Sequence, residues 1–471
     1  MSEPFSDESF RDSVGFIDKD GKRNFIYPKK PKGFFTRYRT YLSWVLLAFL
    51  FAGPFIRIDG QPLLLLNVLE RKFVILGQVF WPQDFYLLVM LLITGVIFVV
   101  VFTAAFGRLF CGWVCPQTIF LEMVFRKIEY WLDGDRGQQL RIANMPWNGE
   151  KIRRRLVKWS IFFLISFIIA NTFLAYIIGS EELINSVTDH PKNHIGTLSA
   201  LLIFTSVFFG VFAWFREQAC IVVCPYGRLQ GVLLDRNSIV IAYDKIRGEI
   251  RSRFRKSEDR EAVGKGDCID CHQCVSVCPT GIDIRNGTQL ECVNCTACID
   301  ACDDIMDKIN KPRGLIRYAS ENQITEGKKP QFTTRLKVYT AILSLLLIIM
   351  GGLLFSRSTM QANILRLPGS NYKVTGDNLI TNLYQFKIVN KSTEKQTFTI
   401  EAVEFPDAIV KPVGADELTT DIQTFAEGIL MITIPKESLP SSKVKITLLI
   451  RSENGDILGK TKVGFPGPMI K

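Results

Sequence analysis

CIDCHQCVSVCPTGIDIRNGTQLECVNCTACIDAC, residues 268–302, contains eight of the twelve cysteines of the chain. The first four follow the spacing C-x2-C-x2-C-x3-C, and the second four repeat it after residues 279–291. In such runs three cysteines bind one iron–sulfur cluster and the fourth binds another. The segment therefore predicts two [4Fe–4S] clusters. The expected ligands are Cys268, Cys271, Cys274 and Cys302 for the first cluster, and Cys292, Cys295, Cys298 and Cys278 for the second.

Two other cysteine frameworks fit this segment less well. Zinc ribbons use two widely separated C-x2-C pairs, whereas here three cysteines stand at triplet spacing before a fourth. A disulfide framework requires an oxidising compartment, and the loop charges described below place this segment in the cytoplasm. The iron–sulfur interpretation is therefore preferred.

The composition indicates a membrane protein. Of the 471 residues 48% are hydrophobic, and 35 are phenylalanines. The net charge is +11, but the basic residues flank apolar runs instead of forming a separate patch. That pattern is typical of a cytoplasmic membrane face in contact with lipid and does not predict a nucleic-acid partner. The first residues lack a basic segment leading into a short apolar core, so no cleavable signal peptide is expected.

Five apolar segments are long enough, or nearly long enough, to cross a bilayer. Residues 1–36 are expected to form a polar N-terminal segment before the first span. Residues 37–243 then form the main membrane region with four helices, and a fifth span follows the cysteine-rich segment. The expected spans are 38–56, 85–106, 159–178, 195–215 and 336–356.

The charges of the loops predict the orientation. Basic residues crowd the loop between the second and third spans, which includes the run KIRRRLVK. The following loop, GSEELINSVTDHPKNH, has a single lysine. By the positive-inside rule, the N-terminus and the cysteine-rich segment face the cytoplasm. Five spans then place the C-terminus outside.

A short motif, C-x3-C-P, is repeated at the ends of the second and fourth spans. Its cysteines are Cys111, Cys115, Cys220 and Cys224. Proline disfavours helical geometry in the residue before it, so a helix break is expected at the second cysteine of each motif. If the two spans are neighbours, the four thiols converge and suit a soft ion such as Cu(I), a further iron–sulfur centre or another redox role. The plainer interpretation is that they are small apolar side chains.

The rest of the chain completes the expected domain order. Residues 244–265 are rich in charge and predict a solvated linker into a ferredoxin-type module at 266–310. Segments within 365–471 alternate apolar and polar residues between turns, which predicts a small antiparallel β-sandwich of the Ig-like type. The expected fold is a multi-domain membrane protein. It combines a five-helix transmembrane bundle, an inserted two-cluster ferredoxin-like α+β module and a C-terminal Ig-like β-sandwich.

No glycine-rich nucleotide fingerprint or flavin motif is evident in the sequence. Electrons are therefore expected to come from an unidentified cytoplasmic donor or from a quinol. We expect them to pass from the two clusters to the four membrane cysteines.

The motifs resemble those of the cytochrome c oxidase accessory proteins of the CcoG family, also called FixG or RdxA. The resemblance includes IYPKKPKGFFTRYR, ERKFVILGQVFWPQDF, both C-x3-C-P motifs and CPTGIDIRNGTQLEC. It implies a bacterial inner-membrane protein with a periplasmic C-terminal domain. It also implies cupric reductase activity, Cu(II) to Cu(I), in assembly of the cbb3-type oxidase, with oxidase assembly factors or a copper chaperone as partners. Cys111, Cys115, Cys220 and Cys224 are then the candidate catalytic and copper-binding residues.

Two other functions remain open. The paired C-x3-C-P motifs also resemble those of NapH-type quinol dehydrogenases, which predicts quinol oxidation without copper. Alternatively, the chain is an assembly scaffold whose sandwich docks the oxidase or a chaperone. A scaffold predicts that cysteine substitutions leave oxidase maturation intact, whereas removal of 365–471 abolishes it.

Overall fold

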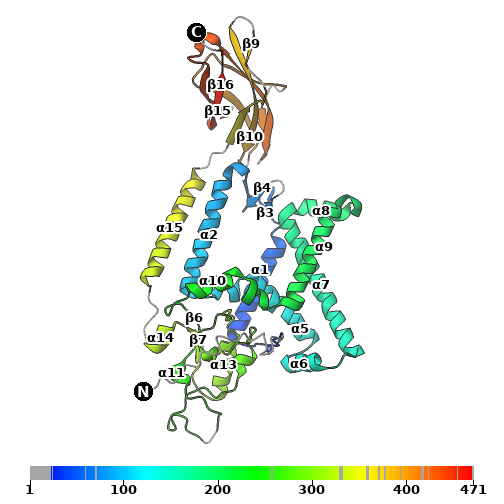
Figure 1. Ribbon diagram of the computed structural model, residues 1–471, viewed down its shortest axis with the longest axis vertical. Coiled ribbons are helices and arrows are strands. Elements are labelled where there is room, and N and C mark those ends of the chain that lie inside the picture. The colour runs from blue at the N-terminus through cyan, green and yellow to red at the C-terminus, as the bar shows by residue number, and fades with distance from the viewer. Residues whose placement is uncertain are drawn as a thin grey trace. The chain divides into compact units, whose positions relative to one another are not determined.

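The chain divides into two compact units (Figure 1). Unit 1 comprises Met1–Ile58, Pro62–Leu76 and Pro82–Ile348, and unit 2 comprises Asp59–Gln61, Gly77–Trp81 and Ile349–Lys471. The predicted N-terminal segment 1–36 falls partly outside the described residues. The computed structural model describes residues 23, 25–58, 60–68, 72–255, 258–327, 332–356, 360–369, 372–375, 378–392, 394–414, 418–422, 424–452 and 455–468.

Four helices in the described part of the chain are long and apolar enough to cross a membrane. Three match the prediction within a few residues. The other, α7, begins ten residues earlier than the predicted span because the side chain of Asn148 accepts a hydrogen bond from Lys151 N and caps the helix. Lys, Arg and Glu form helices as readily as most apolar residues do. Hydropathy therefore finds only the apolar part of α7 and misses its charged first turns. The four are α2 (Phe85–Phe106), α7 (Gly149–Ile178), α9 with its continuation η5 (Ile195–Phe215) and α15 (Thr334–Phe355).

The predicted first span, 38–56, is not among these four. The segment does form a helix, α1 (Phe34–Ala52), which begins and ends four residues before the predicted bounds. Arg37 and Arg39 lie in its first half, and Arg39 is buried, so one side of this half packs against protein. The predicted count of five spanning helices is therefore not confirmed.

Shorter elements of unit 1 connect these helices. The π-helical stretches are η3 (Ile119–Phe125), η5 (Val211–Phe215) and η6 (Ala219–Val223). Strands β3 (Leu64–Asn67) and β4 (Lys72–Ile75) pair antiparallel. The remaining helices are α3 (Leu109–Trp113), α4 (Pro116–Thr118), α5 (Arg126–Leu132), α6 (Arg136–Asn144), α8 (Ser180–Thr188), α10 (Pro225–Leu233), α11 (Lys245–Gly248), α12 (Gln273–Ser276), α13 (Ala297–Lys308) and α14 (Glu321–Thr325).

An aromatic core joins the segments that follow the spanning helices. The rings of Phe125 and Phe212 stack with centroids 4.7 Å apart, and Phe162 meets Phe125 edge-on at 4.8 Å. These residues come from η3, η5 and α7, and all three are buried. Part of the high phenylalanine content therefore fixes the position of η3 against α7 and η5.

The cysteine-rich module is larger than the predicted range 266–310. Strand β6 (Val240–Tyr243) pairs antiparallel with β7 (Ile316–Ala319) and closes the module from outside that range. The predicted solvated linker, 244–265, is instead part of the module. Arg260 within it is buried and donates hydrogen bonds to the carbonyls of Gly266 and Cys268, at 2.6 and 3.0 Å. The many charged residues of 244–265 suggested a solvated linker, but the guanidinium of Arg260 hydrogen-bonds to buried carbonyls of the module.

Unit 2 is a sandwich of two antiparallel sheets, as its alternating sequence predicts. One sheet has the order β12-β14-β10-β8, with β9 also paired to β10, and the other has the order β13-β11-β15-β16. Fully buried Tyr384, Ile432 and Leu448 belong to the core between them. The sandwich begins at β8 (Met360–Arg366), before the predicted start. The other strands are β9 (Lys373–Thr375), β10 (Leu379–Asn390), β11 (Gln396–Ala402), β12 (Ile409–Pro412), β13 (Leu418–Thr420), β14 (Phe425–Pro435), β15 (Lys443–Ser452) and β16 (Ile457–Pro466).

Candidate redox site

The eight cysteines of the module line two small cavities. One cavity is lined by Cys268, Cys271, Cys274 and Cys302, together with apolar side chains such as Met306 and Leu315. The other is lined by Cys278, Cys292, Cys295 and Cys298, with Cys274 also on its wall. We call these the first and second cavities. The structure thus brings the cysteines together in the two groups of four that the spacing predicts.

The backbone explains how three near neighbours in sequence reach one cavity. Asp270 and His272 flank the middle cysteine of the first run, and both have left-handed backbone, φ 52° and 53°. Asn294 and Thr296 flank the equivalent cysteine of the second run with φ 52° and 66°. Left-handed residues reverse the direction of the chain locally, and Asp, Asn and His tolerate this conformation better than most residues. The two runs therefore share one local fold.

The surroundings of these cysteines fit an iron–sulfur cluster. The pKa of Cys274 and that of Cys292 are raised to about 12, mainly by burial and in part by other cysteines nearby. A buried group of four thiols is costly to ionise unless a positive centre compensates the charge. A [4Fe–4S] core supplies such a centre and binds thiolates. The residues present thus fit the predicted cofactor in both cavities.

The two C-x3-C-P motifs have nearly the same backbone. Gly107 and Arg216, each four residues before the first cysteine, have φ, ψ of 57°, −135° and 54°, −124°. Cys115 and Cys224 have φ, ψ of −57°, 123° and −65°, 112°, and a new helix begins at the proline that follows each. The predicted helix breaks are confirmed. The sequence repeat is therefore also a structural repeat.

The two motifs meet, and each contacts the helix that follows the other. Gln230 of α10 is fully buried, and its Nε2 donates to Cys111 Sγ at 3.3 Å. The pKa of Cys220 is raised to about 12, mainly by burial and in part by the thiols of Cys115, Cys111 and Cys224, while a hydrogen bond with Thr118 opposes the rise. The thiols of the two motifs are therefore close enough to act on one another. We call them the membrane cysteine quartet. Within the described residues, no three His, Cys, Asp or Glu side chains are arranged to hold a single metal ion.

Two buried arginines, which the sequence analysis missed, connect the quartet to the second cavity. Arg39 donates from Nε to the carbonyl of Gly112 at 2.6 Å, and its Nη1 lies 3.4 Å from the carbonyl of Cys295. Arg108 donates to the carbonyl of Gly227 and lies close enough to Cys111 and Cys292 to act on both thiols. A fixed positive charge therefore stands between the quartet and the cysteines of the module.

The contact between quartet and module is close. Cys111 packs against a small apolar core that contains Val277, Val293 and Cys295. A Cβ added at Gly112 would lie 2.5 Å from the carbonyl oxygen of Asn294, so only glycine fits there. The glycine that follows the first cysteine of the first C-x3-C-P motif thus lets its helix approach the loop that carries Cys295.

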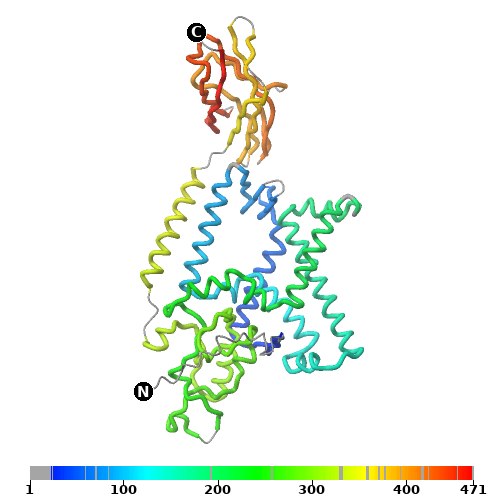
Figure 2. Tube along the Cα trace, in the orientation of Figure 1, coloured from blue at the N-terminus to red at the C-terminus, as the bar shows by residue number. Residues whose placement is uncertain are grey.

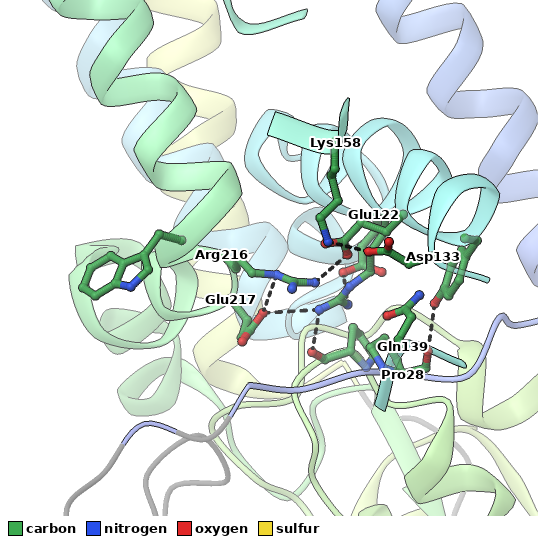
Figure 3. A network of polar contacts seen from close by, with 12 residues as sticks. Pro28, Glu122, Asp133, Gln139, Lys158, Arg216 and Glu217 are labelled. Atoms are coloured by element: carbon green, nitrogen blue, oxygen red, sulfur yellow. Dashed lines mark hydrogen bonds and ion pairs between the residues drawn. The ribbon is translucent and has the colours of Figure 1, made fainter. Parts of the chain in front are cut away.

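A buried ion-pair network lies beside these sites (Figure 3). Arg126 is 1% exposed, pairs with Glu122 at 2.5 Å and Glu217 at 3.3 Å, and donates to the carbonyl of Pro279 at 3.4 Å. Pro279 directly follows Cys278, so the network reaches the second cavity. Further pairs extend the network to α7: Arg216–Glu129 at 2.8 Å, Lys158–Glu129 at 3.6 Å and Lys158–Asp133 at 2.5 Å. The sequence analysis interpreted Arg126 and Lys158 only as topology signals and did not single out Arg216.

The network makes the stability of the protein sensitive to acid. Burial alone would raise the pKa of Glu129, but Arg216, Lys158 and Arg126 hold it below its usual value of 4.5. Such a carboxylate contributes stability above its unfolded pKa and loses it as the pH falls through the folded pKa. We expect Glu129→Gln to lower the free energy of unfolding at pH 7, with a difference from wild type that shrinks below about pH 4.5. Denaturant titration in detergent measures this. Glu150→Gln, on the exposed side of α7, is the control, and an equal pH dependence in both variants would contradict the expectation.

Comparison with known proteins agrees with this arrangement. Residues 215–321 match the family described as "4Fe-4S dicluster domain", residues 88–137 match "4Fe-4S binding domain", and residues 350–468 match the "IG-like fold at C-terminal of FixG". The second match includes the first C-x3-C-P motif. A FixG-related protein from Vibrio parahaemolyticus aligns with 23% of this chain and 97% of its own, at 14% identity and a TM-score of 0.21.

Three proteins are similar over most of the chain. RdxB of Cereibacter sphaeroides is 36% identical, covering 83% of this chain and 85% of RdxB. RdxA of the same organism is 33% identical, covering 94% and 98%. The nitrogen fixation protein FixG of Rhizobium meliloti is 31% identical, covering 91% and 90%. The apolar helices and the 4Fe–4S domains define a membrane-bound iron–sulfur protein of electron transfer. Within that class, the chain belongs to the FixG/RdxA family.

Proposed function

We propose that this protein is a cupric reductase, which reduces Cu(II) to Cu(I) for assembly of a cbb3-type cytochrome c oxidase. The observation that carries the proposal is the membrane cysteine quartet, packed directly against the second cavity through Cys111 and Gly112. The eight cysteines of the module hold two [4Fe–4S] clusters in the predicted groups. Bound there, the clusters supply one-electron carriers of low potential.

The quartet suits the last step of this reaction. Cu(II) prefers nitrogen and oxygen ligands, whereas Cu(I) prefers sulfur, so a thiol-rich site stabilises the reduced product. Each Cu(II) takes up one electron, and the protein loses one. Burial raises the pKa of Cys111 to about 11, and the positive charge of Arg108 opposes this rise.

The topology that serves this role has α1 as a fifth span in a bacterial inner membrane. The N-terminus and the module then face the cytoplasm, where the electron donor is, and the sandwich faces the periplasm. In that compartment the sandwich docks an oxidase assembly factor or a copper chaperone. The excess of basic residues in the loop 126–158 over the loop 179–194 supports this orientation.

Reoxidation by copper tests the proposal. The protein is purified and reduced without oxygen, and stoichiometric Cu(II) is added while the cluster absorbance is followed. We expect the absorbance to recover rapidly, with one Cu(I) trapped by a chelator for each cluster reoxidised, because each cluster gives up one electron. A water-soluble quinone serves as the alternative oxidant. Recovery with quinone and not with Cu(II) would refute the cupric reductase assignment.

A second candidate function, quinol oxidation, is favoured by one cavity. It has a volume of about 430 Å³, within the usual range for small-molecule sites. Apolar side chains of α2 and α15 line most of it, and Asp235 and Arg335 lie at its edge. Faster reoxidation by quinone, abolished by Ala105→Trp in this cavity, would support this function over copper reduction.

A further inference from the structure

The segment 250–255 is fixed to the wall of the first cavity. Ser252 N donates to the carbonyl of Cys268 at 3.3 Å, and the buried Arg260 donates to the carbonyls of both Ser252 and Cys268. Arg251 pairs with Glu249 at 2.7 Å. The segment is thus an ordered part of the module surface, held within hydrogen-bond distance of a cavity cysteine.

The outer side of this segment is apolar and basic. Ile250 is 70% exposed and Phe254 is 41% exposed, and Arg253 and Arg255 are exposed on either side of Phe254. Among the described residues neither arginine makes an ion pair, whereas neighbouring Arg247 and Arg251 do. We call Ile250, Arg253, Phe254 and Arg255 the donor surface. An aromatic centre with unpaired arginines at its rim is a composition typical of protein interfaces.

The donor surface is connected to the most exposed edge of the first cavity. Arg251 donates to the carbonyl of Arg285 at 3.5 Å, and Arg285 in turn contacts Asp270 at 2.6 Å and His272 Nδ1 at 2.9 Å. Cys271, which stands between those two residues, is the one cavity cysteine of the described module classed as exposed. A partner on the donor surface therefore lies next to the place where the first cluster is accessible.

A lipid surface does not fit this position. In Figure 2 residues 250–255 and 258–265 lie at the end of unit 1 away from the spanning helices, beside the rest of the module. Anionic lipid head groups attract basic residues only within about a Debye length of the membrane. The partner of the donor surface is therefore a soluble molecule.

Another cavity beside the module is a less suitable entrance for electrons. It measures about 810 Å³ and also borders the module, next to Gln273 and Val277. Its charges cancel, so they do not select a partner of either sign. Five basic side chains line it, Lys29, Lys30, Lys32, Lys308 and Arg313, and so do five acidic ones, Asp135, Asp300, Asp303, Asp304 and Asp307.

We infer that the donor surface is the docking site of an acidic, soluble one-electron carrier protein that reduces the first cluster. The carrier loses one electron and the protein gains one, and no bond is formed or broken. Complementary charge speeds the encounter, and Phe254 and Ile250 supply apolar contact once the partner is bound. The inference rests on the electron-transfer role proposed above and names the class of its donor.

Stopped-flow reduction of the full-length protein tests the inference. The oxidised protein in neutral nanodiscs is mixed with a reduced acidic plant-type [2Fe–2S] ferredoxin, and the cluster absorbance is followed. We expect the second-order rate to fall about tenfold or more between 0.05 and 0.5 M salt, since screening weakens steering. The double variant Arg253→Glu, Arg255→Glu should lose about as much at low salt. Reduction by dithionite should be unchanged, which shows that the clusters are intact.

A matched control carries the same change of charge elsewhere. Lys443→Glu with Lys445→Glu alters two exposed lysines of the sandwich and should leave the ferredoxin rate at the wild-type value. An equal loss in both double variants, or no loss in either, overturns the inference. Phe254→Ala should slow the reaction at high salt, where apolar contact dominates, and an unchanged rate there counts against the docking site.

Two further arms separate the remaining explanations. Nanodiscs with anionic phospholipid are compared with neutral ones, and a rate that depends on lipid charge through Arg253 and Arg255 would assign the surface to the membrane and overturn the inference. The ferredoxin-reduced protein is then mixed with Cu(II). Fast reduction by ferredoxin without reoxidation by copper would support the donor surface while refuting the cupric reductase.

Discussion

Replacing Cys111, Cys115, Cys220 and Cys224 together by serine should strongly slow the proposed Cu(II) reduction while both clusters of the module remain. We expect the rate of Cu(I) formation to fall about 100-fold or more. Replacing residues that only hydrogen-bond to metal ligands already lowers metal affinity or activity about 10–100-fold, and here the proposed ligands themselves are removed. Serine keeps the size of the side chain but removes the soft sulfur that stabilises Cu(I). The measurement is the rate of Cu(I) formation by the reduced variant, with iron and acid-labile sulfide determined on the same sample.

The exposed cysteine of the first cavity provides the reverse control. Cys271→Ser should change the cluster absorbance and the iron content, because it removes a proposed cluster ligand and leaves the quartet intact. If the quadruple serine variant reduces Cu(II) at the wild-type rate, the quartet is not the site of copper reduction. If the quadruple serine variant also contains less iron than the wild type, the quartet itself binds iron. The match of residues 88–137, which include Cys111 and Cys115, to a 4Fe–4S binding family is the reason to measure this.

Arg126→Met lowers the free energy of unfolding by about 3–5 kcal/mol, the usual cost of breaking a buried ion pair from one side. The reason is that Glu122 then keeps its charge without its partner, and Glu217, 2% exposed, keeps only the longer pair with Arg216 at 3.8 Å. The same change frees the carbonyl of Pro279, which follows a proposed cluster ligand. Denaturant titration of the protein in detergent measures the loss, and the cluster absorbance reports whether the second cavity is disturbed.

An exposed arginine on a neighbouring helix is the matched control. Arg154 pairs with Glu150 at 2.9 Å, but both side chains are at least 40% exposed, so Arg154→Met should cost less than about 1 kcal/mol. Adding Glu122→Gln and Glu217→Gln to Arg126→Met should recover part of the stability, because no uncompensated charge then remains. Equal losses for Arg126→Met and Arg154→Met would show that the buried network contributes little.

The cluster module and the sandwich follow closely from the sequence because their signals are local. The spacing of the eight cysteines predicts which four meet in each cavity, and the left-handed residues around each middle cysteine are set within a few residues. Alternating side chains likewise predict the strands of unit 2. The boundaries of the cluster module are less well predicted. They depend on the pairing of β6 with β7, which are more than seventy residues apart and have no distinctive local sequence pattern.

The apolar segments predicted three spans nearly correctly, whereas the predicted first span, now helix α1, is not among the four apolar helices long enough to cross a membrane. Hydropathy averages a window and does not register that Arg39 is buried against Gly112 and Cys295. The same averaging shortened α7 at its charged end. The linker 244–265 was misjudged for a related reason, because a charged residue in the sequence does not reveal whether its partner is water or, as for Arg260, a buried carbonyl.

By itself, the sequence determined the two-cluster module, the grouping of its cysteines, the repeated C-x3-C-P motif, three of the apolar helices and the sandwich. All of these depend on spacing, periodicity or composition within short segments. Only the tertiary structure decided that the two motifs exchange contacts through Gln230 and Thr118, that Gly112 seats the quartet against the second cavity, and that Arg126 lies in a buried network. Those features join residues that are distant along the chain. They also depend on burial, and the sequence does not reveal whether a charged side chain such as that of Arg126 lies at the surface or inside the protein.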